Sequence, residues 1–382
     1  METINMLQLN SYFIANKLHQ KLTSTMLSKN VQQTMYIPIK SKELENRNIV
    51  DSDQLEFHYD YILKKQDRFL YKGKIKKQLK RIEEKIPDIK EFDLIHAHTL
   101  FSDGGTAYLL HQKYGLNYVV SVRSADIYAF YKYAFFHRPF IHQVLKHASA
   151  VVFISHAYKK QTFDVLPKKV VKAIEHKTKV IPNGIDDKWF ETTPIQRNDS
   201  IKPIRLLFTG SLDKNKNLST VLKLVHSLKY DDDKEIFLNV AGDGPLKKKL
   251  MTECKWLNLQ EMVYFHGNVS IEKLRALADE SDVFILPSYK ETFGISYVEA
   301  MSRGLPIIYT RGEGIDGFFP EGVVGYSSYP DDVYDMAESI DLIQNSYTEI
   351  SNNCIQESKR FNWHDIANEY RALYEAVKES GK

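Results

Sequence analysis

The sequence predicts an α/β protein with two doubly wound domains in tandem, each a parallel sheet covered by helices. Three observations predict this class. Short apolar segments alternate with helical patterns almost from end to end, and most of the segments are apolar throughout. Strands that are buried on both faces of a parallel sheet have this composition. A polar stretch without apolar periodicity, residues 187–203, separates the two halves and predicts an interdomain linker.

The second half of the chain shows the alternation most clearly. We expect its strands at residues 204–211, 236–242, 262–267, 283–288 and 306–310. The helices between them are expected at residues 217–228, 245–257, 271–280 and 295–301. Pro245 stands at the start of the second of these helices, a position that proline favours.

The first half repeats the pattern less regularly. Its strands are expected at residues 4–10, 34–39, 94–99, 118–124, 150–155 and 178–184. Residues 363–379 alternate apolar and polar side chains with helical spacing, which predicts a long amphipathic helix at the C-terminus. The expected division is an N-terminal domain at 1–186, a linker at 187–203, a C-terminal domain at 204–360 and a final helix at 361–382.

Composition excludes several classes of protein. The chain has 382 residues, 43% of them hydrophobic and 26% charged, which is typical of globular proteins. The net charge of +3 creates no general demand for a polyanionic partner, and no nucleic-acid recognition module is visible in the sequence, so we expect no nucleic-acid partner. Two cysteines suit a reducing cytoplasm better than a secreted disulfide scaffold. The first residues lack the pattern of a signal peptide, and no apolar run reaches the length of about 18 residues that spans a membrane.

Two carboxylates flank the start of the helix expected at 295–301. Glu291 lies in the loop that follows a buried strand, at the carboxyl end of the sheet, where open α/β sheets bind ligands. Gly294 would let a ligand approach the backbone, and the amides of Phe293, Gly294 and Ile295 would offer a phosphate seat at a helix N-terminus. Glu299, about one turn into the helix, can accept both hydroxyls of a ribose. Either acid alone is more simply a helix-capping or solvated residue; the pair at this edge favours a nucleotide-sugar site.

The stretch from Glu291 to Glu299, followed by AMSRGLPII, resembles the signature of the family 4 retaining glycosyltransferases, which have the GT-B fold. The blocks VIPNGID, FTGSLDKNKN, AGDGP, FHGNV and ILPSYKETFG resemble that family's blocks in the same order. DLIHAHTLFSDGG and SVRSADIYAF resemble its N-terminal blocks more loosely. The resemblance implies two Rossmann-like domains that face each other across a cleft, with the C-terminal helix crossing back to the N-terminal domain.

The resemblance also implies roles for individual residues. Glu299 would bind the donor ribose, Glu291 would hold the transferred sugar, and Lys216 would neutralise the diphosphate. A fixed cation is chemically suited to that place, because the leaving group gains negative charge as the glycosidic bond breaks. Backbone groups around Gly294 and Ile295 would contact the sugar or diphosphate, and Gly267 and Val269 would seat the base.

The sequence departs from the family pattern in three places. Ser211 stands where the family usually has a second diphosphate cation, an arginine directly after the glycine. Arg123 stands where a histidine is common, although Asp126 of the same block is retained; an arginine cannot accept a proton at neutral pH. The loop after the first strand contains no glycine. Arg123 and Asp126 remain candidates for the catalytic site, and His98 and Asn183 for the acceptor side.

Metal-binding patterns are weak. His96 and His98 would share one face of a strand end, but no third ligand is identifiable, so a hydrogen-bonded pair is the simpler interpretation. The acidic triplets that begin at Asp51 and Asp231 are common by chance. The family that the chain resembles needs no metal, so we expect no metal and no cofactor.

A basic and an aromatic segment suggest a membrane surface. Residues Lys64–Arg81 carry nine basic side chains and one acid, with apolar residues on one helical face. Such a helix can lie on an anionic bilayer, or it is a solvated helix packed by its apolar face. Residues 126–140 add a dense aromatic cluster with Lys132 and Arg138.

The function that the sequence predicts is a retaining, metal-independent hexosyltransferase. It would use a nucleotide-diphosphate sugar and a glycan or glycolipid acceptor in capsule, exopolysaccharide or other cell-envelope polysaccharide biosynthesis. We expect it in the cytoplasm, peripheral to the inner face of the plasma membrane. The alternatives are a non-catalytic partner subunit of a glycosyltransferase complex, and a nucleotide-sugar epimerase or hydrolase.

Overall fold

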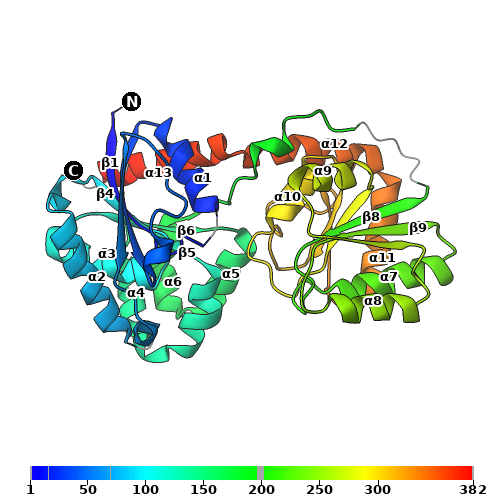
Figure 1. Cartoon of the computed structure of the whole chain (residues 1–382), viewed down its shortest axis with the longest axis horizontal. Coiled ribbons are helices and arrows are strands. Elements are labelled where there is room, and N and C mark those ends of the chain that lie inside the picture. Colours follow the sequence, from blue (N-terminus) through cyan, green and yellow to red (C-terminus); the bar gives the residue numbers. More distant parts are fainter. Residues whose placement is uncertain (1, 16, 69, 196–201, 381–382) are drawn as a thin grey trace. The chain divides into compact units, whose positions relative to one another are not determined.

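The computed structural model describes residues 2–15, 17–68, 70–195 and 202–380, which form two compact units. Unit 1 comprises residues 1–154, 159–182 and 363–382, and unit 2 comprises residues 155–158 and 183–362. Each unit is a parallel sheet with helices packed on it (Figure 1). The predicted fold class, two doubly wound α/β domains, is therefore confirmed.

The sheet of unit 1 has seven strands in the order β3-β2-β1-β4-β5-β6-β7, and every neighbouring pair is parallel. Its strands are β1 (Ile4–Leu9), β2 (Val31–Ile39), β3 (Leu55–Tyr61), β4 (Leu94–Ala97), β5 (Tyr118–Val122), β6 (Ala150–Phe153) and β7 (Thr178–Val180). The order reverses between β1 and β4, so their carboxyl ends mark the point where doubly wound sheets bind ligands.

The helices of the first half connect these strands. They are α1 (Leu18–Leu27), α2 (Tyr71–Lys85), α3 (Ser102–Tyr114), α4 (Arg138–His147), α5 (His156–Val165) and α6 (Lys168–Ile174). Short helical turns are η1 (Lys42–Leu44), η2 (Lys65–Arg68), η3 (Ile89–Glu91), η4 (Asp126–Tyr131), η5 (Phe135–His137) and η6 (Glu175–Lys177). η4 is a π-helix, the form that closes hydrogen bonds over five residues and often marks a functional site.

The last helix of the chain, α13 (Trp363–Glu379), belongs to unit 1. It packs beside α1 (Figure 1), and its apolar face joins one buried cluster with side chains of β1, β4, β5 and β6. Ile366, Tyr370 and Tyr374 lie in that cluster. The expectation that the C-terminal helix crosses back to the N-terminal domain is confirmed.

The sheet of unit 2 has six strands in the order β10-β9-β8-β11-β12-β13, again parallel throughout. Its strands are β8 (Ile204–Thr209), β9 (Ile236–Ala241), β10 (Val263–Gly267), β11 (Val283–Leu286), β12 (Ile307–Thr310) and β13 (Gly325–Ser328). Its helices are α7 (Leu218–Tyr230), α8 (Lys247–Trp256), α9 (Ile271–Asp279), α10 (Ile295–Met301), α11 (Val333–Asn345) and α12 (Tyr347–Ser358), with turns η7 (Asp187–Trp189) and η8 (Lys359–Phe361).

The structure differs from the expected boundaries at the join between the halves. Besides residues 155–158, unit 2 comprises the chain from Asn183 on, not from residue 204, and the polar stretch expected as a linker contributes to its core. Trp189 at the end of η7 is buried, because its indole packs into unit 2 and donates to Glu299. Residues 196–201 of the expected linker lie outside the described residues.

Two strands are absent from the sequence-based expectation. β3 (LEFHYDY) and β13 (GYSS) are edge strands of their sheets, and both carry polar residues that an apolar-run criterion rejects. An edge strand tolerates such residues because part of it faces solvent.

Candidate functional site

The loop after β11 brings Glu291 against Lys216. Glu291 Oε2 lies 2.5 Å from Lys216 Nζ, and both side chains are largely covered. Lys216 comes from the loop after β8, where the carboxylate of Asp213 accepts from the N–H groups of Asn215 and Lys216 and so shapes the turn. Strands β8 and β11 are neighbours, so the two loops meet at the carboxyl edge of the sheet. The predicted carboxylate and the predicted cation are thus direct partners.

The backbone around Glu291 is fixed from both sides. Its N–H donates to the Glu313 carboxylate (2.9 Å), and its carbonyl accepts from Gly314 N (2.8 Å). Gly294, with φ +82°, precedes α10, and a Cβ there would lie 2.4 Å from the ring of buried Tyr297. The glycine is therefore required by packing inside the loop as well as by its left-handed conformation.

Phe293, Gly294 and Ile295 form the entry to α10. Phe293 is buried, and Ile295 begins the helix. The first N–H groups of an α-helix have no acceptor within the helix. The backbone here can accordingly donate hydrogen bonds to a ligand beside Glu291.

Glu299, on the following turn of α10, accepts a hydrogen bond from Trp189 Nε1 (3.1 Å). Burial raises the pKa of the Glu299 carboxyl to about 7, the indole hydrogen bond opposes this shift, and the nearby Asp186 charge adds to it. The carboxyl therefore sits close to half-ionised at neutral pH, unlike a solvated glutamate. Sequence reasoning missed Trp189 because it falls in a polar stretch; the preceding NGID block was the available signal.

A cavity of about 400 Å³ opens at the carboxyl ends of β8, β9 and β10. Ser211 and Val269 line it, as do residues of the AGDGP turn. Gly267 precedes the lining residue Asn268 in the chain, and its carbonyl accepts from Gly242 N (2.8 Å). A Cβ on Gly242 would lie 1.9 Å from the Gly210 carbonyl oxygen, so this glycine allows two loops to touch. Its volume is in the range of small-molecule binding sites.

In unit 1, Arg123 and Asp126 lie together after β5. Both oxygens of the Asp126 carboxylate accept backbone N–H groups, from Leu100 (3.0 Å), Phe101 (3.2 Å) and Arg123 (2.8 Å). Burial raises the pKa of Asp126 to about 6 against the effect of these hydrogen bonds. Arg123 Nε donates to the carbonyl of His98 (3.3 Å). Asp126 thus ties two loops together, which makes it a positioning residue in this geometry.

His98 directly follows β4 and lies beside the end of β1, where its N–H donates to the Leu9 carbonyl (3.0 Å). Its Nε2 lies 2.5 Å from Gln8 Oε1, its ring centroid lies 4.0 Å from that of His96, and burial lowers its pKa well below the usual value. His98 Nδ1 and Asn10 Nδ2 are buried and find no hydrogen-bond partner among the described residues. His96 is satisfied by Tyr374 and Ser121. Each histidine thus hydrogen-bonds to other side chains, and His98 Nδ1 stays unbonded among the described residues at the ligand edge of the sheet.

Asp103 was not predicted from the sequence. It stands at the start of α3 and accepts from Ser11 N, Ser11 Oγ (3.1 Å) and Thr99 Oγ1 (3.1 Å). Burial raises its pKa to about 7. Ser11 belongs to the glycine-free loop after β1, so its bonds to Asp103 fix the shape of that loop. Asn183, expected on the acceptor side, belongs to unit 2 and is half-buried.

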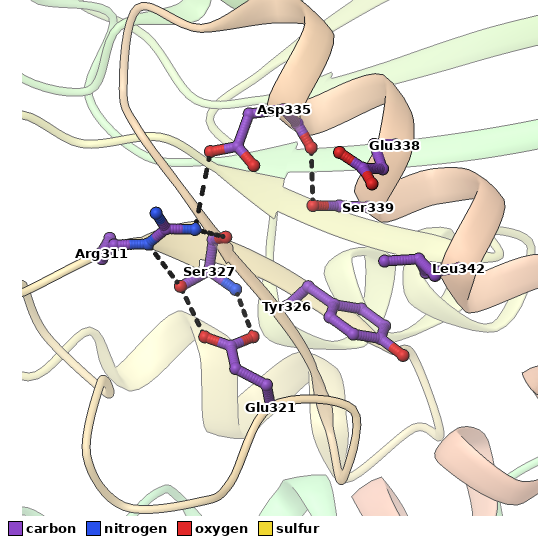
Figure 2. Close-up of a pocket in the computed structure, with 8 residues that line it drawn as sticks. All are labelled: Arg311, Glu321, Tyr326, Ser327, Asp335, Glu338, Ser339 and Leu342. Atoms are coloured by element: carbon purple, nitrogen blue, oxygen red, sulfur yellow. Dashed lines mark hydrogen bonds and ion pairs between the residues drawn. The ribbon is translucent and has the colours of Figure 1, made fainter.

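A second cavity of about 400 Å³ lies between β13 and α11 (Figure 2). Its charged groups bind one another: the Glu321 carboxylate accepts from Ser327 N and Oγ, and Arg311 reaches Ser327 Oγ (3.2 Å) and Asp335 (3.8 Å). None of the residues predicted for the site lines it. This network closes the edge of the sheet.

Two family models match consecutive parts of the chain. The model of glycosyl transferases group 1 matches residues 191–361, and that of Glycosyltransferase Family 4 matches residues 22–189. The boundary between the matches falls close to the division of the structure into units.

Several curated proteins are similar in sequence. An alpha-monoglucosyldiacylglycerol synthase of Streptococcus pneumoniae is 26% identical over 266 residues, 64% of this chain and 56% of that protein. A putative teichuronic acid biosynthesis glycosyltransferase of Bacillus subtilis is 25% identical over 234 residues, 59% of this chain and 55% of that protein. The similarity thus spans about half the length of such relatives.

Solved structures share the fold over almost the whole chain. A sucrose-phosphate synthase from Thermosynechococcus elongatus superposes with a TM-score of 0.74 at 17% identity, covering 99% of this chain and 100% of that one. Anabaena HepE in complex with UDP gives 0.69 at 18% identity, covering 98% and 100%. With both halves matched and this fold, the chain belongs to the family 4 glycosyltransferases of the GT-B type.

Proposed function

We propose that the chain is a retaining glycosyltransferase that moves a hexose-type sugar from a nucleotide diphosphate to an acceptor hydroxyl. The observation that carries the proposal is the Lys216–Glu291 pair beside a cavity at the carboxyl edge of unit 2. A bound diphosphate needs a cation, and the hydroxyls of a bound sugar need a hydrogen-bond acceptor. Lys216 and Glu291, which are in direct contact at this edge, supply one of each.

Unit 2 would bind the donor. Ser211 and Val269 would line the base site with the backbone of Gly267. Glu299 would accept the ribose hydroxyls while Trp189 Nε1 donates to its Oε1. Lys216 would contact the diphosphate. Glu291, released from the lysine, would accept sugar hydroxyls, helped by the N–H groups at the start of α10.

The reaction breaks the bond between the anomeric carbon and the donor phosphate oxygen and forms one to the acceptor oxygen. Retention follows if the acceptor attacks from the face of departure and the leaving phosphate takes its proton. Lys216 would stabilise the charge that grows on that phosphate. This route needs no protein base and no metal, and it agrees with an arginine at position 123, which stays protonated.

The acceptor side would lie in unit 1. His98 Nδ1 and Asn10 Nδ2, buried without partners among the described residues, mark groups that a hydroxyl-rich ligand can satisfy. A lipid-linked or surface-polysaccharide glycan at the inner face of the plasma membrane is the proposed acceptor. Support comes from relatives whose names specify a glycolipid synthase and teichuronic acid biosynthesis. The exposed lysines of α2, Lys72, Lys76 and Lys80, would add attraction to an anionic membrane.

The test is a panel of UDP-, GDP- and ADP-linked sugars, read by thermal shift and by slow release of free nucleotide. UDP sugars come first, because HepE was solved with UDP and UDP-glucose. One donor should stabilise the wild type and Lys214→Ala, a change at an exposed lysine of the same loop. Lys216→Ala and Glu299→Ala should lose the shift. Absence of any donor binding would contradict the proposal and favour the partner-subunit alternative; release of sugar without an acceptor requirement would favour a hydrolase.

A further inference from the structure

Four large aromatic side chains gather on the surface of unit 1 within residues 127–138, called here the aromatic segment. Phe136 is 79% exposed, Tyr133 71%, Phe135 54% and Phe130 42%. The rings of Phe135 and Phe136 lie against each other with centroids 3.9 Å apart. Exposed apolar side chains are normally scattered singly, and a contiguous group marks an interaction surface.

The surroundings of the segment are basic. Residues 127–163 contain no Asp or Glu but five basic residues, Lys132, Arg138, Lys146, Lys159 and Lys160. From α2, Lys72 lies near enough to His137 to reinforce the lowering of its pKa by burial. The nearby acid of η2, Asp67, is mostly covered and pairs with Lys77 (3.7 Å). Lys132, 5.4 Å from the centre of the Tyr133 ring, together with Arg138 and Lys72, therefore places positive charge beside the exposed rings.

The segment is held in place from beneath. Arg138 Nε donates to the Tyr131 carbonyl (2.9 Å), and the guanidinium lies 4.6 Å from the centre of the Tyr131 ring. Tyr131 Oη lies 2.9 Å from His142 Nε2 of α4, and Phe130 packs on Phe101, 5.5 Å between centroids. The fold thus fixes the base of the segment and leaves its outer rings in solvent.

α2 cannot serve as the bilayer-embedded helix that its sequence suggests. Its apolar face, with Tyr71, Ile75 and Ile82, is buried against unit 1, in contact with α3. Its exposed face carries Lys72, Lys76 and Lys80, with Glu84 near its end. Within Lys64–Arg81, residue 69 lies outside the described residues. Among the described residues, no helix is both long and apolar enough to cross a membrane.

We infer that the aromatic segment docks the chain on an anionic lipid bilayer, with Phe135 and Phe136 entering the headgroup boundary. A bilayer accounts for both features of the surface, because the rings enter the headgroup boundary while lysine and arginine reach the lipid phosphates. An acidic protein would match the positive charge but would not bury the protruding rings. The inference rests on the proposed function in one respect: a lipid-linked acceptor is the reason for the enzyme to dock on a membrane. The segment starts beside Asp126, at the ligand edge of the unit 1 sheet, so docking would bring that edge to the membrane.

The test is sedimentation of the full chain with vesicles of phosphatidylcholine containing phosphatidylglycerol, and with vesicles of phosphatidylcholine alone. Wild type should bind the anionic vesicles, less strongly as salt rises. Phe135→Ser with Phe136→Ser should weaken binding roughly tenfold or more. Lys132→Gln and Lys72→Gln should each weaken it about fivefold.

Trp256→Ser is the matched control, because Trp256 of α8 in unit 2 is 83% exposed and outside the segment. It should bind vesicles as wild type does, and all variants should keep the wild-type unfolding temperature. Equal binding to neutral vesicles, no binding to anionic ones, or an equal loss in Trp256→Ser would overturn the inference. Donor binding measured without vesicles separates the two proposals: vesicle binding without donor binding contradicts only the proposed function, and the reverse contradicts only the docking surface.

Discussion

Glu299 shows how one side chain reports on its site. A buried carboxyl that holds a single indole N–H pays for lost hydration, and its pKa rises to about 7. Ribose hydroxyls would donate more strongly to the ionised carboxylate, which accepts through both oxygens, than to the protonated form, which uses one oxygen as a donor. Binding a donor therefore favours loss of the proton.

We therefore predict that affinity for a nucleotide sugar rises with pH through about 7. One pH unit below the Glu299 pKa, the ionised fraction and hence the affinity should be roughly tenfold below those one unit above it. Titration calorimetry with an intact nucleotide sugar checks this, because its diphosphate has no terminal phosphate that titrates nearby. Glu299→Gln should bind weakly with a flat pH profile. An unchanged slope in that variant would assign the titration to another group.

The Lys216–Glu291 pair predicts opposite effects on two ligands. Without a sugar, Glu291 competes with a diphosphate for the lysine. Glu291→Gln should bind bare nucleoside diphosphate about fivefold more tightly, as expected for release of a partly exposed ion pair. The same variant should transfer sugar at least about a hundredfold more slowly, because the sugar loses its hydroxyl acceptor.

Calorimetry and nucleotide release measure the two effects separately. Glu338→Gln, at an exposed carboxylate of the second cavity, should change neither. Weaker nucleotide binding in Glu291→Gln would mean that the carboxylate orders the lysine instead of competing for it.

Sequence patterns singled out Glu291 and Lys216, which the fold brings together, but not the contacts that these residues make. Glu291 and Lys216 come from loops 75 residues apart, and only the sheet order makes them touch. Trp189 was not predicted, because a polar neighbourhood hides a buried residue. Asp126 was predicted as catalytic, but no sequence pattern shows that three backbone N–H groups occupy its oxygens.

At the scale of the element, the start of α10 depends on one glycine. Gly294 and Gly312 have similar positive φ values, +82° and +77°. A Cβ added at Gly294 would clash with the Tyr297 ring, whereas a Cβ added at Gly312 would have no neighbouring atom within 4 Å. Gly294→Ala should lower the free energy of unfolding by about 3 kcal/mol or more, and Gly312→Ala by about 1 kcal/mol. Urea unfolding compares them; equal losses would mean that φ alone decides the cost.

The elements themselves were predictable where their burial is two-sided. β8, β9, β11 and β12 are central strands with apolar runs, and all four were expected. β3 and β13 were not expected, because an edge strand such as GYSS shows no apolar periodicity that distinguishes its sequence from that of a loop. Strand order is equally hidden, since it is decided by long-range packing and not by local pattern.

At the scale of the whole molecule, the last helix of the chain packs on the first unit. α13 buries its apolar face with β1 and α1, so unit 1 is incomplete without the last residues of the sequence. Ile366→Ala should destabilise unit 1 by roughly 2–5 kcal/mol, whereas Asn368→Ala on the exposed face should change stability by less than about 0.5 kcal/mol. Hydrogen exchange of β1 and β4 amides reports on unit 1 directly. Equal protection in both variants would contradict the packing of α13 on this sheet.

The measurement that tests the central claim most directly is calorimetric titration of the donor into wild type, Lys216→Ala and Lys214→Ala. The account predicts saturable binding by wild type and Lys214→Ala, and a loss of about tenfold or more in Lys216→Ala, because one fixed cation contacts the diphosphate. Equal affinity in all three proteins would contradict a donor site at the Lys216–Glu291 pair.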